Sequence, residues 1–203
     1  MKTSDFNYHL PEKLIANYPL NSRSSSRLLV HSESLEHLFF KDIISFFQQG
    51  DLLVLNNTSV IPARLFGKKE SGGSIEVMLE RVLEKNRALV QIRSGRSPKI
   101  GSNIVINSIT IKCIGRQDNF FILQFDRSPI EIFNAIGHVP LPPYIKRPDE
   151  ELDKHRYATV YEDTTQQDSV AAPTAGLHFD NNLLESIKNK GCLLYTSDAA
   201  DDQ

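Results

Sequence analysis

The stretch that decides the fold reads SIEVMLERV, from Ser74 to Val82, where apolar and polar side chains alternate. Alternation with a period of two residues is typical of a β-strand with one buried face. Further short runs of β-forming residues follow, separated by Gly, Asn and Asp: Ala88–Arg93, Asn103–Ile106, Ile109–Ile114 and Phe120–Phe125. Short strands at this spacing predict a small antiparallel β-barrel or sandwich. A helix, Pro129–Ile136, and a proline-rich connector come next.

The segments on either side of these strands indicate a mixed α/β domain. DLLVLNN, from Asp51 to Asn57, is a continuous apolar run that predicts a strand buried on both faces. Lys41–Gln49 and Asp180–Gly191 predict amphipathic helices, the second with Asp180 as N-cap and Gly191 as its C-terminal stop. We therefore expect an α/β domain in two segments, 1–67 and 151–191, interrupted by a β-barrel domain over 68–150.

The last twelve residues, CLLYTSDAADDQ, do not continue this pattern. A buried strand is expected after the helix, yet the chain turns at once into a small, acidic stretch. Back-translated, residues 192–202 resemble a transposon-derived sequencing adapter read as codons. We expect residues 192–203 to be non-native and the α/β domain to be truncated after Gly191; a natural frayed terminus is the alternative.

Composition excludes several classes of protein. The 203 residues are 40% hydrophobic and 24% charged, which is typical of a globular protein. No apolar run approaches the ~20 residues that cross a bilayer, and the N-terminus has no signal-peptide pattern. Cys113 and Cys192 stand far apart and fit a reducing cytoplasm. We expect a cytoplasmic protein without a Cys-rich zinc site; the sequence leaves its oligomeric state open and is compatible with a monomer.

Three segments carry an unusual density of polar residues: NNTSVIPARL (Asn56–Leu65), LPPYIKRP (Leu141–Pro148) and VAAPTAGLHF (Val170–Phe179). In the third, small residues and His178 precede a predicted helix. Small residues let a ligand approach the backbone, and a helix start offers free N–H donors. Alone this signal is weak, because a single histidine is more often structural and Pro-Thr-Ala-Gly is also an ordinary turn.

Together, in this order and spacing, the three segments resemble the S-adenosylmethionine:tRNA ribosyltransferase-isomerase family of queuosine biosynthesis. LPEKLIANYPL (Leu10–Leu20), GDLLVLNNT and RYATVY (Arg156–Tyr161) resemble it as well, so the resemblance extends over residues 1–191. It implies an α/β domain with an inserted β-barrel. S-adenosylmethionine is then the co-substrate that donates its ribosyl group, and no prosthetic group or metal is needed.

The resemblance also implies the acceptor, the aminomethyl-deazaguanine at the wobble position of tRNA. Transfer and rearrangement give epoxyqueuosine and release adenine and methionine. A chain cut after Gly191 is expected to be inactive. The alternative function is a non-catalytic β-barrel module that only binds RNA, whereas a Rossmann-type enzyme is rejected because no G-x-G-x-x-G follows a strand.

Candidate site residues follow from the motifs. His178 is the candidate for acid–base work, with a purely orienting role as the alternative. Arg64 is the second catalytic candidate, since it is suited to bind the methionine carboxylate or an RNA phosphate. A surface salt bridge is the alternative role for this residue. Residues expected to bind S-adenosylmethionine are Asn56, Asn57, Thr58, Thr174 and Gly176. For the asparagines, ordinary turn chemistry is the alternative.

Basic residues in Gly- and Pro-containing loops are the candidates for RNA contact. Tyr144 is suited to stack on an unpaired base. The cationic candidates are Arg93, Arg96, Lys99, Lys146 and Arg147, supported by Lys68 and Lys69. Because the net charge is only −2, RNA contact has to come from such local patches. Solvated basic loops without a ligand are the alternative. We expect Glu76, in the SIEVMLERV strand, to face solvent.

Overall fold

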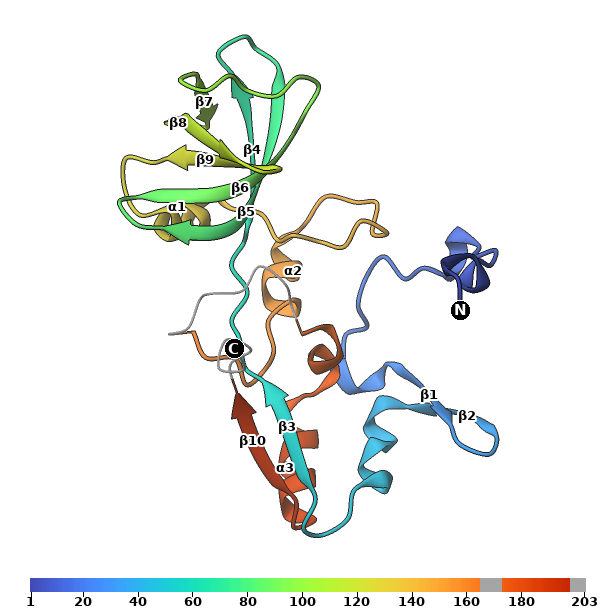
Figure 1. The fold of residues 1–203 in the computed structure, drawn as a ribbon. Helices are drawn as coiled ribbons and strands as arrows, with labels where there is room; N and C mark the ends of the chain where they lie inside the picture. Colours follow the sequence, from blue (N-terminus) through green and yellow to red (C-terminus); the bar gives the residue numbers. More distant parts are fainter. Residues whose placement is uncertain (165–172, 198–203) are drawn as a thin grey trace.

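The computed structural model describes residues 1–164 and 173–197. Val170, Ala171 and Ala172 of the VAAPTAGLHF segment lie outside these residues, as do 198–203. A β-barrel stands above the other elements in Figure 1, and the chain passes between the two parts where β3 leads into β4 and where it returns after α1. The fold is thus the expected α/β arrangement with an inserted barrel.

The barrel is closed and antiparallel, with the strand order β4-β5-β6-β9-β8-β7. Each run of β-forming residues in the sequence forms a strand, and Val60–Phe66, where Pro62 forbids a helix, leads into one more. The strand β4 includes both residues 67 and 68, between which the sequence placed the start of the barrel domain. The bounds are β4 (Arg64–Lys69), β5 (Ser74–Leu83), β6 (Arg87–Ser94), β7 (Asn103–Ile106), β8 (Ile109–Gln117) and β9 (Phe120–Gln124).

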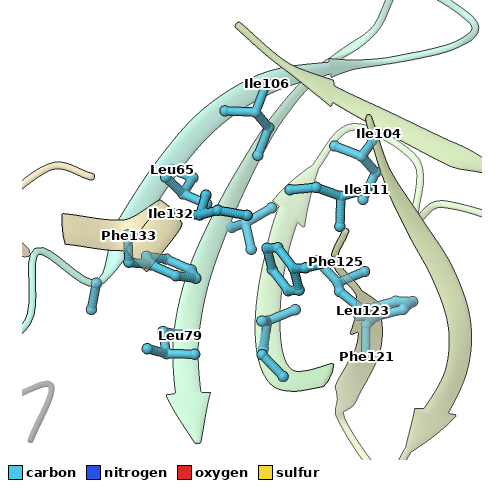
Figure 2. Packing of buried hydrophobic residues seen from close by; sticks show 14 of the residues in the cluster. Leu65, Leu79, Ile104, Ile106, Ile111, Phe121, Leu123, Phe125, Ile132 and Phe133 are labelled. Carbon is cyan, nitrogen blue, oxygen red and sulfur yellow. The ribbon is translucent and has the colours of Figure 1, made fainter. Parts of the chain in front are cut away.

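Alternate residues of these strands fill the barrel interior. On β5, Ile75, Val77 and Leu79 are buried while Glu76 and Met78 are not, as the period of two predicts. The helix α1 (Pro129–Ile136) has the predicted bounds and packs against the barrel's core. Figure 2 shows its Ile132 and Phe133, both fully buried, pointing into the same core as the strand residues. The helix is therefore part of the barrel's core.

The α/β part contains a two-stranded parallel sheet of β3 (Leu52–Asn56) and β10 (Leu193–Ser197). The helix α3 (Asn181–Asn189) covers one face of this sheet, and its N-terminus is capped as predicted: Asp180 Oδ1 accepts a hydrogen bond of 2.9 Å from the backbone N–H of Leu183. The prediction that β3 is buried on both faces is wrong. Leu52 and Val54 are each 58% exposed, because the described residues cover only the α3 side. The non-native origin of residues 192–203 stays a prediction.

The N-terminal region is a hairpin and a series of short helical turns. The hairpin pairs β1 (Arg27–His31) with β2 (Leu35–Phe39). The helix expected at Lys41–Gln49 is a 3-10 helix, η4 (Phe40–Phe46), and its Phe46 is half exposed. The remaining helical elements are η1 (Thr3–Phe6), η2 (Glu12–Leu14), η3 (Arg23–Ser25), α2 (Glu151–Arg156) and η5 (Thr174–His178).

Candidate functional site

The polar segment after β3 packs against residues 159–163. The backbone N–H of Asp163 donates to the carbonyl of Asn57 at 2.8 Å. The hydroxyl of Ser59 donates to Glu162 Oε2 at 3.0 Å. Asn56 Oδ1 accepts a 2.8 Å bond from the backbone N–H of Thr58, which is the local turn chemistry that competes with a ligand-binding role for Asn56. The structure therefore joins two segments about 100 residues apart in the chain.

Three buried polar side-chain atoms in this region have no hydrogen-bond partner in the described part of the chain. They are Asn57 Oδ1, Thr58 Oγ1 and Thr159 Oγ1. Thr58 is 4% exposed and Thr159 is 5% exposed. An unsatisfied buried polar group costs about 1–3 kcal/mol, so a folded protein retains a group of them only where something offsets that cost. Two of the three belong to the expected S-adenosylmethionine site, and Thr159 was not anticipated.

Gly176 of η5 lies against the same segment. A Cβ at this position would lie 2.1 Å from Tyr161 Oη and 3.3 Å from Thr159 Cγ2. Gly176 is buried, whereas Thr174 is exposed at the start of the turn. The absence of a side chain at Gly176 is thus explained by close packing within the protein and calls for no ligand at its backbone.

His178 faces the N-terminal region. Its Nδ1 lies 3.0 Å from Ser26 Oγ, and its ring lies 5.2 Å from that of Phe40. Burial lowers the pKa of His178, a hydrogen bond with the Arg23 backbone opposes this, and the positive charges of Arg156 and Arg23 lower it further. The imidazole is therefore neutral at pH 7 and able to accept a proton. Its fixed contacts agree equally with the orienting role.

Arg23 holds η5 and the end of α2 together. Its Nη1 donates to the Leu177 carbonyl at 3.0 Å, and its Nη2 donates to the carbonyls of His155 and Ala158 at 2.8 and 2.7 Å. Sequence reasoning missed this residue. The only signal was an arginine in a serine-rich loop, and its partners lie more than 130 residues away.

Arg64 is paired within the chain. Its Nε lies 3.2 Å from Glu76 Oε1, with the two side chains 24% and 26% exposed. Its backbone exchanges hydrogen bonds with His138, and its Nη2 donates to the Leu141 carbonyl at 3.4 Å. Glu76 lies on the outward face of β5 and is partly exposed, as predicted, and its carboxylate pairs with Arg64. Arg64 thus joins the barrel to the proline-rich connector.

Of the RNA candidates, the barrel group is free of ion pairs within the described residues. Arg93, Arg96 and Lys99 are exposed in and beside the loop between β6 and β7. Lys69 Nζ donates to the Arg96 carbonyl at 2.5 Å, so β4 contributes a further cation at this loop. The geometry suits contact with phosphate groups.

The second group, in the proline-rich connector, differs from the barrel group. Tyr144 is 57% exposed. Lys146 is exposed and forms an ion pair with Glu12. Arg147 is mostly buried and forms a bidentate pair with Asp153 at 2.6 and 2.8 Å. This pairing raises the pKa of Arg147 and lowers that of Asp153. Arg147 therefore has a structural role, which corrects its expected place at an RNA-binding surface.

A cavity and a cleft lie near the junction and near the start of α3. Neither is lined by His178, Arg64 or the residues expected to bind S-adenosylmethionine. A cavity of about 140 Å³ lies between α1, α2 and the segment that leads into β4, and Tyr157 lines it. Burial raises the pKa of Tyr157 to about 12. A more open, polar cleft of about 320 Å³ lies at the start of α3, beside Ser24 and Lys41.

Within residues 1–164 and 173–197, no helix is long and apolar enough to span a membrane. The same residues contain no group of three or more His, Cys, Asp or Glu side chains arranged to hold a metal ion.

The fold and the site define the class of protein. It is a mixed α/β protein with an inserted six-stranded barrel and a buried polar cluster at the junction. A family model described as queuosine biosynthesis protein matches residues 3–196. The chain therefore belongs to the queuosine biosynthesis protein family. It is also similar to the crystal structure of S-adenosylmethionine tRNA ribosyltransferase from Thermotoga maritima, with 31% identity and a TM-score of 0.37. The match covers 95% of this chain and 56% of the Thermotoga maritima chain, so the chain spans little more than half of that protein's length.

Proposed function

We propose that this chain is part of a tRNA-modifying transferase-isomerase. S-adenosylmethionine is the co-substrate, and its ribosyl group is transferred to the aminomethyl-deazaguanine wobble base of tRNA and rearranged. The products are epoxyqueuosine, adenine and methionine. The observation that carries this proposal is the family match, which extends over residues 3–196 and so includes every candidate group described above.

The reaction makes demands that the described residues are suited to meet. A sulfonium cation acidifies the neighbouring C–H group, a base must remove that proton, and adenine must then leave. A neutral His178 has a lone pair that is suited to accept the proton, and burial, which lowers its pKa, favours this neutral form. The oxygens of Asn57, Thr58 and Thr159, which have no hydrogen-bond partner among residues 1–164 and 173–197, are suited to hydrogen-bond the hydroxyl groups of the ribose or the edge of the adenine. Arg64, already paired with Glu76, is suited to position the connector.

The proposed activity belongs to a protein of the length of the Thermotoga maritima relative, because this chain covers 56% of that protein. We expect the 203-residue chain alone to bind S-adenosylmethionine weakly and to release little or no adenine. We further propose that the protein acts in the cytoplasm.

Adenine release tests the proposal. The full-length product of the gene is incubated with S-adenosylmethionine and tRNA that carries the aminomethyl-deazaguanine, and adenine is measured by chromatography. Adenine is expected with this tRNA and not with tRNA that carries guanine at the wobble position. No release with the modified tRNA would refute the transferase, and RNA binding without release would favour the binding module.

A substitution of His178 tests whether this residue acts as the acid or base. His178→Gln is expected to lower turnover by about 10²-fold or more, as loss of a general acid or base usually does. His37→Gln is the matched control, since His37 is exposed on β2. A decrease of less than about threefold for His178→Gln would leave His178 only an orienting role.

A further inference from the structure

The proline-rich connector is a preformed loop whose two ends are fastened to each other. His138 Nδ1 lies 2.9 Å from Asp149 Oδ1, and the backbone N–H of Val139 donates to Asp149 Oδ2 at 3.1 Å. One carboxylate thus closes the loop from residue 139 to residue 149. Arg64 holds the same end to the barrel through its backbone bonds with His138.

Within the loop, proline and local hydrogen bonds restrict the backbone. Pro140, Pro142, Pro143 and Pro148 fix four φ angles. The N–H of Leu141 donates to the Val139 carbonyl at 2.8 Å, and that of Ile145 donates to the Pro142 carbonyl at 3.0 Å. Ordering this loop on binding therefore costs little conformational entropy.

The far side of the loop is fastened to the N-terminal region. Arg147 Nε donates to the Asn17 carbonyl at 2.8 Å, and its guanidinium lies 4.2 Å from the centre of the Tyr18 ring. The Tyr18 hydroxyl donates to Glu150 Oε1 at 2.9 Å. Both ends and one side of the loop are therefore held by the rest of the protein.

The exposed part of this fixed loop is an aromatic side chain. Tyr144 is 57% exposed between Pro143 and Ile145, and its electrostatic effect helps burial to raise the pKa of Tyr157. Tyr157 lines the cavity at the junction of the barrel and the α/β part. A large aromatic group on a loop that is held at both ends, and itself half open to solvent, has the properties of a stacking platform for an unpaired base.

We propose that Tyr144 stacks on one unpaired base of the RNA, with Asp149 as the positioning residue that holds the loop, while the cations at the β6–β7 loop bind phosphates. The inference rests on the proposed function, because that function makes an RNA with unpaired bases the substrate. The β6–β7 loop and the proline-rich connector differ in whether their cations are already paired. Arg93, Arg96 and Lys99 are free of ion pairs among the described residues, whereas Lys146 and Arg147 are paired with Glu12 and Asp153.

Binding of a short RNA stem–loop, measured by fluorescence anisotropy with the 203-residue chain, tests this division. Tyr144→Leu is expected to weaken binding by about 5- to 150-fold, the usual effect of losing one base–aromatic stack, and to leave the salt dependence unchanged. Tyr144→Phe is expected to bind within about twofold of the wild type, because it retains the ring. Tyr8→Leu is the matched control, since Tyr8 is exposed elsewhere in the N-terminal region.

Substitution of a cation at the β6–β7 loop is expected to change the salt dependence of RNA binding. Arg96→Gln is expected to lower the slope of log affinity against log salt by about 0.7 to 0.9, the value for one lost phosphate contact. Asp149→Asn is expected to weaken binding of the stem–loop without changing that slope. Addition of Tyr144→Leu to Asp149→Asn is then expected to weaken binding less than Tyr144→Leu does alone, because Asp149 acts through Tyr144.

Two results would overturn the inference: Tyr144→Leu binding within about twofold of the wild type, or a fully paired duplex binding as tightly as the stem–loop. The assay contains no S-adenosylmethionine. Stacking by Tyr144 can therefore be confirmed while adenine release fails, or refuted while adenine release succeeds, so the two proposals fail separately.

Discussion

Replacement of Arg23 by lysine should loosen the segment that carries His178. The guanidinium forms three hydrogen bonds of 2.7 to 3.0 Å with the carbonyls of His155, Ala158 and Leu177. These carbonyls belong to two separate parts of the chain, the end of α2 and η5. A lysine ammonium keeps the charge but lacks the planar fork, so it cannot donate to all three carbonyls in this geometry.

The magnitude follows from the bonds lost. A hydrogen bond from a charged donor contributes about 1.5–3 kcal/mol, and one between neutral groups about 1 kcal/mol. Lysine is expected to retain one of the three bonds. Because Arg23 is only partly buried, we use the lower values for the two lost, which gives a decrease of about 2–3 kcal/mol in the free energy of unfolding.

Urea denaturation followed by circular dichroism measures this decrease. Arg27→Lys is the matched control, since Arg27 is exposed on β1, and it is expected to change the unfolding free energy by less than about 0.5 kcal/mol. Proton NMR of His178 gives a second measurement, because Arg23→Gln removes a positive charge that lowers the pKa of His178, which should therefore rise. If Arg23→Lys were as stable as Arg27→Lys, the proposed tie between α2 and η5 would be refuted.

Gly176→Ala is expected to destabilise the protein by about 1–3 kcal/mol, because its Cβ would lie 2.1 Å from Tyr161 Oη. Tyr161→Phe should recover part of this loss in urea denaturation, and no recovery would place the clash elsewhere. Tyr157 is expected to ionise at about pH 12 in an absorbance titration, so the stability it contributes declines above about pH 10, where the unfolded chain loses the proton first. Tyr157→Phe should remove the ionisation near pH 12 from the titration, and an unchanged titration would show that Tyr157 does not cause it. Because the pKa of His178 is lowered from 6.5, the unfolded chain binds a proton first, and stability is expected to decrease as the pH falls below about 6.5. His178→Gln should reduce this decrease, and an equal decrease in both proteins would show that other groups cause it.

The barrel could be predicted from the sequence because its signals are local. The strand β7 and the helix α1 have the predicted bounds, Asn103–Ile106 and Pro129–Ile136. Period-two alternation, the Pro at the helix start and the Gly after its end are all readable within a few residues. The run DLLVLNN was different. Its apolar residues indicated a strand, but they could not show that one face of β3 stays uncovered in the described residues.

Most site residues could not be assigned from the sequence because their surroundings come from distant segments. Arg64 and Arg147 are both arginines in Pro-flanked motifs, and sequence reasoning gave each a ligand. In the structure, Arg64 instead pairs with Glu76, and Arg147 pairs with Asp153. Nothing in the spacing distinguishes a carboxylate supplied by the protein from one supplied by a ligand. Arg23 was missed for the same reason, since all of its acceptors are backbone carbonyls.

The contacts at the two crossings between the barrel and the α/β part give the proposed site its geometry. The chain enters the barrel after Ser59 and leaves it before Asp149. Arg64 and His138 pair by backbone bonds at the barrel end, and Ser59 bonds with Glu162 beyond it. The two crossings are therefore paired with each other on both sides of the junction and do not act as two independent linkers. This pairing restricts how far a base stacked on Tyr144 could move relative to Thr58 and Thr159, the groups proposed to hold the ribosyl donor. Asp149→Asn should for this reason affect turnover by the full-length protein more than its affinity for S-adenosylmethionine alone.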